Sequence, residues 1–240
     1  AWRAAPSNGG TFLKHDLLVN NFPSLLDGFR NLGARAEYFA PAHDPAMDAY
    51  AARSDRPIDV LFVGTFSRHH RKRVAMLETI ASLRGEMAVV MCLDISRYTR
   101  LAETPLGWLG PLRKDRRNRD LRAVSRPPLF GRDLLAMLAS AKIVVNGAID
   151  MAGQDRGNMR VWETMGCQAA LVSDRGNYPP GMEDGIHFRT YGTAEELRAI
   201  LTEMAVNENA TRELATRGNT MIRSLYSKDA QWQRFVDLAS

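Results

Sequence analysis

The stretch that decides the fold is Gly157-Asn158-Met159-Arg160-Val161-Trp162-Glu163, which stands between two largely apolar runs, 141–146 and 169–173. Each run is short, as in a strand buried on both faces of a parallel sheet, and the segment between them has the pattern of a loop that enters a helix. This order predicts that Asn158, Arg160 and Glu163 lie around a helix start at the carboxyl edge of the sheet. Open α/β sheets bind ligands at this edge, and the first N–H groups of a helix favour anions.

Strands and helices are predicted to alternate through most of the chain. The expected strands are 36–39, 58–63, 88–93, 141–146, 169–173 and 185–191. The expected helices are 22–32, 72–83, 133–139, 158–167, 194–206, 210–225 and 230–238. Residues 96–128 form a long polar excursion without an assigned element. This alternation predicts an α/β fold with a Rossmann-like, doubly wound parallel sheet that helices cover on both faces.

Composition indicates an ordinary globular protein, since 45% of the 240 residues are hydrophobic and 25% are charged. No apolar run approaches the roughly 20 residues that a membrane-spanning helix needs. The two cysteines, Cys92 and Cys167, do not suggest a disulfide framework, so a reducing cytoplasm is the expected location. The chain starts at Ala1 without an initiator Met or a signal-peptide core, and we expect it to begin within a longer protein.

Positive charge is concentrated in one segment. The net charge is +5, and Arg113–Arg126 alone has seven Lys or Arg against two Asp, so the remainder is neutral. Three interpretations stay open: a solvated loop or surface helix, peripheral contact with an anionic membrane at its inner surface, and nucleic-acid binding. Nucleic-acid modules usually add aromatic residues that stack on bases, and this segment has none, so we expect no nucleic-acid partner.

A second candidate site follows the strand at 58–63. Gly64 and Thr65 form a turn, and Gly64 allows the backbone to approach a ligand. Three arginines follow around the start of the next helix, where they would neutralise phosphate groups; they are Arg68, Arg71 and Arg73. The helix dipole disfavours basic residues in a first turn, which points to a function for them. No third ligand accompanies His69 and His70, so no metal site is expected.

Glu163 stands in a largely apolar helix and therefore needs a dedicated partner, because burial of an unpaired charge is unfavourable. We expect its carboxylate to accept hydrogen bonds from the hydroxyls of a ribose. Asn158 and Arg160 either bind the same ligand, cap the helix or pair with Asp155. The sequence lacks G-x-G-x-x-G, G-x-x-x-x-G-K-[ST] and G-x-S-x-G, which argues against a dinucleotide site, a P-loop and a hydrolase nucleophile elbow.

Three segments, 139–146, 158–163 and 170–174, resemble the C-terminal domain of GT-B-fold glycosyltransferases of group 1, and within it the spore-maturation-protein-like branch. The segment 59–65, with Arg71 or Arg73 after it, resembles the opening strand and phosphate loop of that domain. The ending from Tyr226 to Phe235 resembles the terminal helix that returns toward the N-terminal domain. Gln168 departs from the family pattern, which usually has Gly at this position.

This resemblance implies a metal-independent enzyme whose co-substrate is a nucleotide-diphosphate sugar, with no other cofactor. It implies a remnant of the N-terminal domain and linker in 1–55, a donor-binding domain in 56–226 and a returning helix in 227–240. The residues that it assigns to the donor are Gly64, Thr65, Arg68, Arg71, Arg73, Asn146, Asn158, Arg160 and Glu163. The acceptor (a glycan, a lipid or a protein) and the catalytic residues stay unassigned.

Two other function classes stay open beside this one. The first is a non-catalytic module that binds a nucleotide sugar or a phosphate. The second is an adaptor that binds polyanions or a membrane surface through Arg113–Arg126, and it predicts steeply salt-dependent binding with no response to nucleotides.

Overall fold

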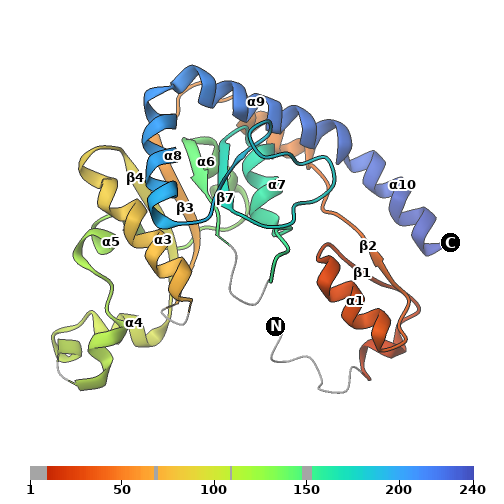
Figure 1. Ribbon diagram of the computed structural model, residues 1–240, viewed down its shortest axis with the longest axis horizontal. Helices are drawn as coiled ribbons and strands as arrows, with labels where there is room; N and C mark the ends of the chain where they lie inside the picture. Colours follow the sequence, from red (N-terminus) through yellow and green to blue (C-terminus); the bar gives the residue numbers. More distant parts are fainter. Residues whose placement is uncertain (1–9, 68–69, 109, 148–152) are drawn as a thin grey trace.

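The computed structural model describes residues 10–67, 70–108, 110–147 and 153–240. Its centre is a six-stranded parallel sheet with the strand order β5-β4-β3-β6-β7-β8 (Figure 1). In chain order the strands are β3 (Ile58–Phe66), β4 (Val89–Ile95), β5 (Ser125–Arg126), β6 (Ala141–Val145), β7 (Ala170–Asp174) and β8 (Arg189–Tyr191). The expected α/β class and parallel sheet are confirmed.

Helices cover both faces of this sheet, as the alternation of side chains along β3 requires. Val60 and Phe62 point into one buried cluster, under α3 and α8, while Leu61 and Val63 point into the other, under α6. The helices around the sheet are α3 (Arg71–Ser82), η4 (Leu83–Gly85), α6 (Gly131–Ala139), α7 (Met159–Gly166), α8 (Ala194–Val206) and α9 (Glu208–Leu225). A third cluster, centred on Trp162, lies where α7 packs on α9.

The long excursion after β4 is more structured than its polar sequence suggested. It forms α4 (Arg97–Ala102), η5 (Pro105–Trp108), η6 (Gly110–Asp115) and α5 (Arg119–Ala123) before it returns as the edge strand β5. These pieces are short and carry little apolar periodicity, which is why the sequence left them unassigned. Among the described helices, none is both long and apolar enough to cross a membrane.

The N-terminal part forms a separate unit, which we call the β1-α1-β2 unit. It comprises η2 (Phe12–Lys14), β1 (Leu18–Asn20), α1 (Pro23–Asn31) and β2 (Ala36–Tyr38), and β1 pairs with β2 in parallel. Gly33, at φ +89°, follows α1 and ends it, because glycine adopts this left-handed conformation without strain. The chain then passes through η3 (Pro45–Met47) and α2 (Asp48–Ala51) to the main sheet.

The last helix, α10 (Lys228–Ala239), returns to this unit, as Figure 1 shows. Phe235 packs against Phe39 with ring centroids 5.7 Å apart, and Arg35 donates to the backbone carbonyl of Leu238 at 2.9 Å. The β1-α1-β2 unit is therefore connected to the rest of the protein twice: by the chain that leads through η3 and α2 to β3, and by its contacts with α10. The division into 1–55, 56–226 and 227–240 stays a prediction.

Candidate functional site

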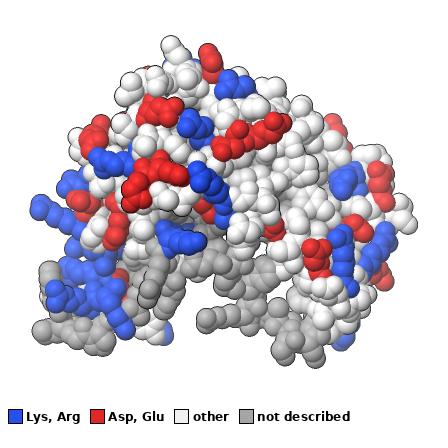
Figure 2. Space-filling view, viewed as in Figure 1, with Lys and Arg blue, Asp and Glu red and all other residues white. Residues whose placement is uncertain are grey.

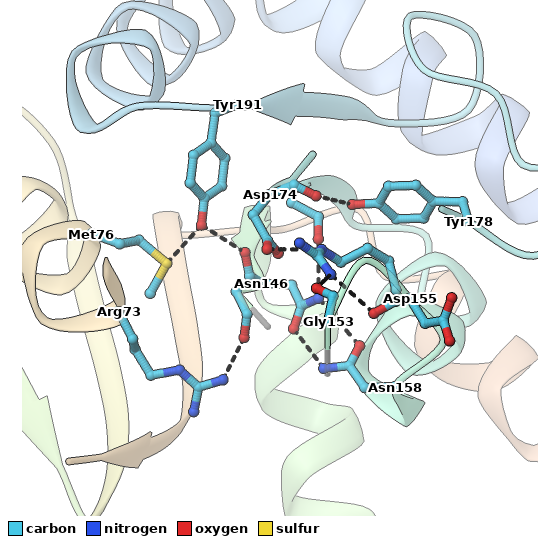
Figure 3. A network of polar contacts seen from close by, with 12 residues as sticks. Arg73, Met76, Asn146, Gly153, Asp155, Asn158, Asp174, Tyr178 and Tyr191 are labelled. Atoms are coloured by element: carbon cyan, nitrogen blue, oxygen red, sulfur yellow. Dashed lines mark hydrogen bonds and ion pairs between the residues drawn. The ribbon is translucent and has the colours of Figure 1, made fainter. Parts of the chain in front are cut away.

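Two asparagine side chains join the end of β6 to the start of α7 (Figure 3). The amide of Asn158 donates to Oδ1 of Asn146 at 2.9 Å, and the Asn146 amide donates back at 3.2 Å. Asn146 also donates to Oγ of Ser173 at 3.1 Å. Asn158 occupies the N-cap position, but its side chain makes no capping bond. The N–H of Val161 donates to the Asn158 carbonyl at 3.0 Å, whereas the N–H groups of Met159 and Arg160 have no acceptor among the described residues and stay available at this edge.

Arg73 brings the start of α3 to the same edge. Its guanidinium donates to the carbonyl oxygen of Gly147, and at 3.5 Å to that of Thr65. Gly64 and Thr65 lie within β3 and not in the expected turn, because the strand continues to Phe66 alongside β4. The end of β3, the start of α3 and the segment after β6 therefore meet around one side chain. A Cβ on Gly64 would lie 2.9 Å from the Phe62 ring, so glycine is also needed here for packing within the strand.

Two of the three arginines expected at this edge, Arg68 and Arg71, have side chains outside the described part of the structure. Arg68 lies outside the described residues. Arg71 is the first residue of α3, and its side chain also lies outside the described part of the structure. Their expected contact with phosphate stays a prediction.

Arg160 is the partner of Glu163 that the sequence required. Its Nη1 lies 2.6 Å from Oε2 of Glu163, and the two side chains are 18% and 17% exposed. Burial lowers the pKa of Arg160, and the charge of Glu163 opposes this shift. A carboxylate held in this way keeps a fixed orientation one turn inside α7. Arg160 thus pairs along its own helix instead of with Asp155.

Three residues that the sequence analysis missed support the site (Figure 3). The Tyr191 hydroxyl, from β8, lies 3.1 Å from the carbonyl oxygen of Asn146, and burial raises its pKa well above the ordinary value. Arg156 lies 2.8 Å from Asp174 in an ion pair at the end of β7. The position of Asp174 directly after an apolar strand was a usable signal. Nothing local in the sequence marks Tyr191 or Arg156.

The loop before α7 also contacts the β1-α1-β2 unit. Oδ2 of Asp155 accepts from the backbone N–H of Ser24 at 2.8 Å and from its hydroxyl at 2.6 Å. Asp155 is 5% exposed, and from the loop before α7 it accepts a hydrogen bond from a backbone N–H in the first turn of α1 that has no partner within that helix. The Asn21 side chain donates to the carbonyl oxygen of Gly157. The N-terminal unit therefore rests on the loop that positions Asn158.

Removal of this contact should loosen α1. We expect Asp155→Ala to leave the Ser24 N–H without its acceptor, which destabilises the helix start by about 1–2 kcal/mol. Hydrogen exchange at residues 23–31 should then be roughly 5- to 30-fold faster. Asp184→Ala is the matched control, because Asp184 accepts from the N–H and hydroxyl of Thr190 on the nearby strand β8. Equal exchange at α1 in both variants would contradict this role of Asp155.

The groups at this edge suit a nucleotide better than a metal cluster. Arg73 and the first N–H groups of α7 can donate to phosphate oxygens, while Glu163 can accept from hydroxyls. Across the described ranges, no three His, Cys, Asp or Glu side chains gather as a metal site would require.

Known structures share this architecture at low sequence identity. HepE of Anabaena, in a crystal structure with UDP and glucose, matches 93% of this chain with a TM-score of 0.64 and 14% identity. TarM of S. aureus matches 94% with a TM-score of 0.64 and 13% identity, over 44% of its own length. Sucrose-phosphate synthase of Thermosynechococcus elongatus matches 95% with a TM-score of 0.60 and 15% identity, over 59% of its length. The chain spans 62% of HepE.

A family model described as glycosyl transferase-like matches residues 70–237, which include α3, the Asn146–Asn158 pair and α7. A search of curated protein sequences found no match. The sheet order and the structural neighbours agree with the group 1 GT-B resemblance of the sequence. Since the family model covers more than half of the chain, this protein belongs to the glycosyl transferase-like family, and its parallel sheet with flanking helices matches a domain of GT-B glycosyltransferases.

Proposed function

We propose that this protein transfers a glycosyl group from a nucleotide-diphosphate sugar, which binds at the carboxyl edge of the six-stranded sheet. The observation that carries the proposal is the position of Glu163, which the partly buried Arg160 holds at 2.6 Å one turn into α7. HepE, which shares the fold, has been crystallised with UDP and glucose and with UDP-glucose, which supports this class of ligand.

Glu163 is proposed to bind the ribose of the donor. Its Oε2 accepts from Arg160, and within the described part of the chain its Oε1 accepts no hydrogen bond. A carboxylate oxygen has two acceptor positions, so a fixed Glu163 can accept from the two neighbouring hydroxyls of a ribose. Because Arg160 sets its orientation before the ligand arrives, little side-chain entropy is lost on binding.

The diphosphate is proposed to lie between the starts of α3 and α7. Arg73 lies there, with Arg68 and Arg71 expected beside it, and the uncapped N–H groups of α7 face the same edge. Negative charge develops on the leaving diphosphate as the glycosyl bond breaks, and positive groups placed in advance stabilise this charge. In this proposal arginines and helix ends supply that stabilisation without a metal ion.

Titration calorimetry with UDP, GDP, ADP and dTDP tests the donor site. We expect saturable binding of one of these diphosphates, with the same affinity in EDTA and in Mg²⁺. Arg73→Gln should weaken this binding by roughly 10-fold or more, because a hydrogen bond to a charged group contributes about 1.5–3 kcal/mol. Failure of the full-length protein to bind any of the four would contradict the donor site. Binding without transfer to any acceptor would leave a non-catalytic module as the function.

The acceptor (a glycan, a lipid or a protein) is proposed to approach from the side of the β1-α1-β2 unit. The contact of Asn21 with Gly157 supports this direction, because it places the start of that unit beside Asn158. We also propose that the protein works in the reducing cytoplasm. Both cysteines, Cys92 and Cys167, are free and buried, which is compatible with that location.

A further inference from the structure

The chain leaves the sheet after β4 and forms a protruding basic lobe, residues 96–124, before it returns as β5 (Figure 1). Figure 2 shows Lys and Arg side chains gathered in the same region, at the lower left of the view. The lobe has eight Lys or Arg against three Asp or Glu. This excess of five equals the net charge of the whole chain, so the remainder of the protein is neutral.

Two of these basic residues hold the lobe together. Arg117 donates to both carboxylate oxygens of Glu103, at 2.6 and 2.8 Å. Burial acts to raise the pKa of Glu103, but the bonds and charge of Arg117 outweigh it and leave the pKa below its ordinary value. Arg116 donates to the backbone carbonyl of Ala102 at 2.9 Å. These contacts fix the fold of the lobe, while its other basic side chains remain at the surface.

The other basic side chains of the lobe face outward. Those classed as exposed are Arg97, Arg100, Arg113, Lys114, Arg119 and Arg122. A cavity of about 900 Å³ opens between Glu103, which follows α4, and the start of α5, and four arginines line it: Arg116, Arg117, Arg119 and Arg122. Its single carboxylate, Glu103, is the one that Arg117 already neutralises. The surface therefore presents concentrated positive charge.

Apolar side chains stand beside this charge on α4. Tyr98 is 50% exposed and Leu101 is 52% exposed, and their i,i+3 spacing puts them on one side of the helix. The guanidinium of Arg97 lies 5.0 Å from the centroid of the Tyr98 ring. An exposed tyrosine and leucine among arginines is the composition of helices that lie at the surface of an anionic bilayer.

Other anionic partners fit this surface less well. A small phosphate site needs buried, convergent donors, whereas Arg119 and Arg122 are exposed to solvent. A nucleic acid would need several open ring faces for base stacking, and Arg97 occupies one face of the Tyr98 ring. Leu101 has no counterpart in either kind of site, but it can enter the headgroup region of a bilayer.

We propose that the basic lobe docks this protein on an anionic bilayer surface, with its arginines among the lipid headgroups and with Tyr98 and Leu101 at the acyl boundary. The lobe leaves the sheet after β4, which pairs with β3, and returns as the edge strand β5. None of its basic side chains is among those proposed to bind the donor, so the two proposals rest on different residues and can fail separately.

Sedimentation with lipid vesicles tests the proposal. We expect the chain to bind phosphatidylcholine vesicles that contain phosphatidylglycerol and not vesicles of phosphatidylcholine alone. Binding should weaken as salt is raised, because salt screens exposed charges. Inorganic phosphate at matched ionic strength should not displace the protein. Equal binding to neutral vesicles would overturn the proposal. So would displacement of the protein by phosphate that exceeds the displacement by a simple salt at the same ionic strength.

Charge variants locate the surface. Arg113→Gln, Arg119→Gln and Arg122→Gln together should weaken vesicle binding roughly 100-fold, since each basic residue near such a surface contributes about fivefold. The matched control changes three exposed arginines elsewhere, Arg175→Gln, Arg198→Gln and Arg217→Gln, with the same loss of net charge. It should lose far less affinity. Equal losses in the two triple variants would show that net charge, and not the lobe, binds the vesicle.

The apolar contribution has its own readout. Tyr98→Ser with Leu101→Ser leaves the charge unchanged and should reduce vesicle binding at high salt more than at low salt. The alternative, a nucleic-acid surface, is tested by measuring the binding of a single-stranded oligonucleotide to the same variants. If the oligonucleotide binds more tightly than anionic vesicles and depends on the same three arginines, the lobe is a nucleic-acid surface and the proposal is wrong.

Discussion

Glu163→Gln should weaken binding of the preferred nucleoside diphosphate by roughly 10- to 150-fold, or about 1.5–3 kcal/mol. Glutamine keeps an oxygen that can accept from Arg160, but it replaces a charged acceptor with an amide. The ribose hydroxyls would then meet one neutral acceptor and one amide donor. Titration calorimetry on both chains, with circular dichroism to confirm that each is folded, measures this effect.

The control for this prediction is Glu203→Gln. Glu203, on α8, forms an Arg–Glu pair with Arg189 of β8 at 3.3 Å, and this pair is more exposed. Its removal takes away the same charge and should leave the affinity for nucleotide unchanged. Wild-type affinity in Glu163→Gln would remove the main support for the donor site, whereas an equal loss in both variants would indicate a general effect of charge.

Trp162→Ala should lower the free energy of unfolding by about 3–5 kcal/mol, the largest stability effect that we expect from one side chain. Trp162 is fully buried, packs edge-on against Tyr226 with centroids 5.8 Å apart, and fills the centre of the third core cluster. For a chain of this size, the change corresponds to a drop in melting temperature of roughly 10 °C. Thermal unfolding followed by circular dichroism measures it.

Two further substitutions separate packing from other effects. Trp232→Ala removes the same side chain where it is 65% exposed, on α10, and should change stability by about 0.5 kcal/mol or less. Trp162→Phe keeps an aromatic ring and removes an indole N–H that is buried without a hydrogen-bond partner among the described residues. It should therefore lose less than the alanine variant. Similar melting temperatures for Trp162→Ala and Trp232→Ala would contradict the central position of Trp162.

Several elements could be predicted from sequence because their patterns are local. The helix expected at 194–206 has the observed bounds of α8, since its apolar residues repeat with helical spacing and Thr193 caps it by accepting from the Glu196 N–H. The runs 58–63 and 169–173 contain the cores of β3 and β7. By contrast, β5 has two residues and exists only because β4 offers it an edge, so no periodicity could reveal it.

The candidate site divides in the same way. The sequence by itself determined that Asn158, Arg160 and Glu163 follow a buried strand and begin a helix, because parallel strands place all such helix starts at one edge of the sheet. It also determined that Glu163 needs a partner. Only the tertiary structure decided that this partner is Arg160 and that Asn146 pairs with Asn158.

The contacts between distant segments depend entirely on the tertiary structure. Asp155 and Ser24 are 131 residues apart, and Tyr191 reaches Asn146 across 45 residues. A hydrogen bond between such residues leaves no period in the sequence, because its partner is chosen by how the sheet and helices pack and not by chain neighbours. The sequence alone thus determines the sheet edge and the residue types on it, whereas packing decides which of those groups hold one another and which stay available for a ligand.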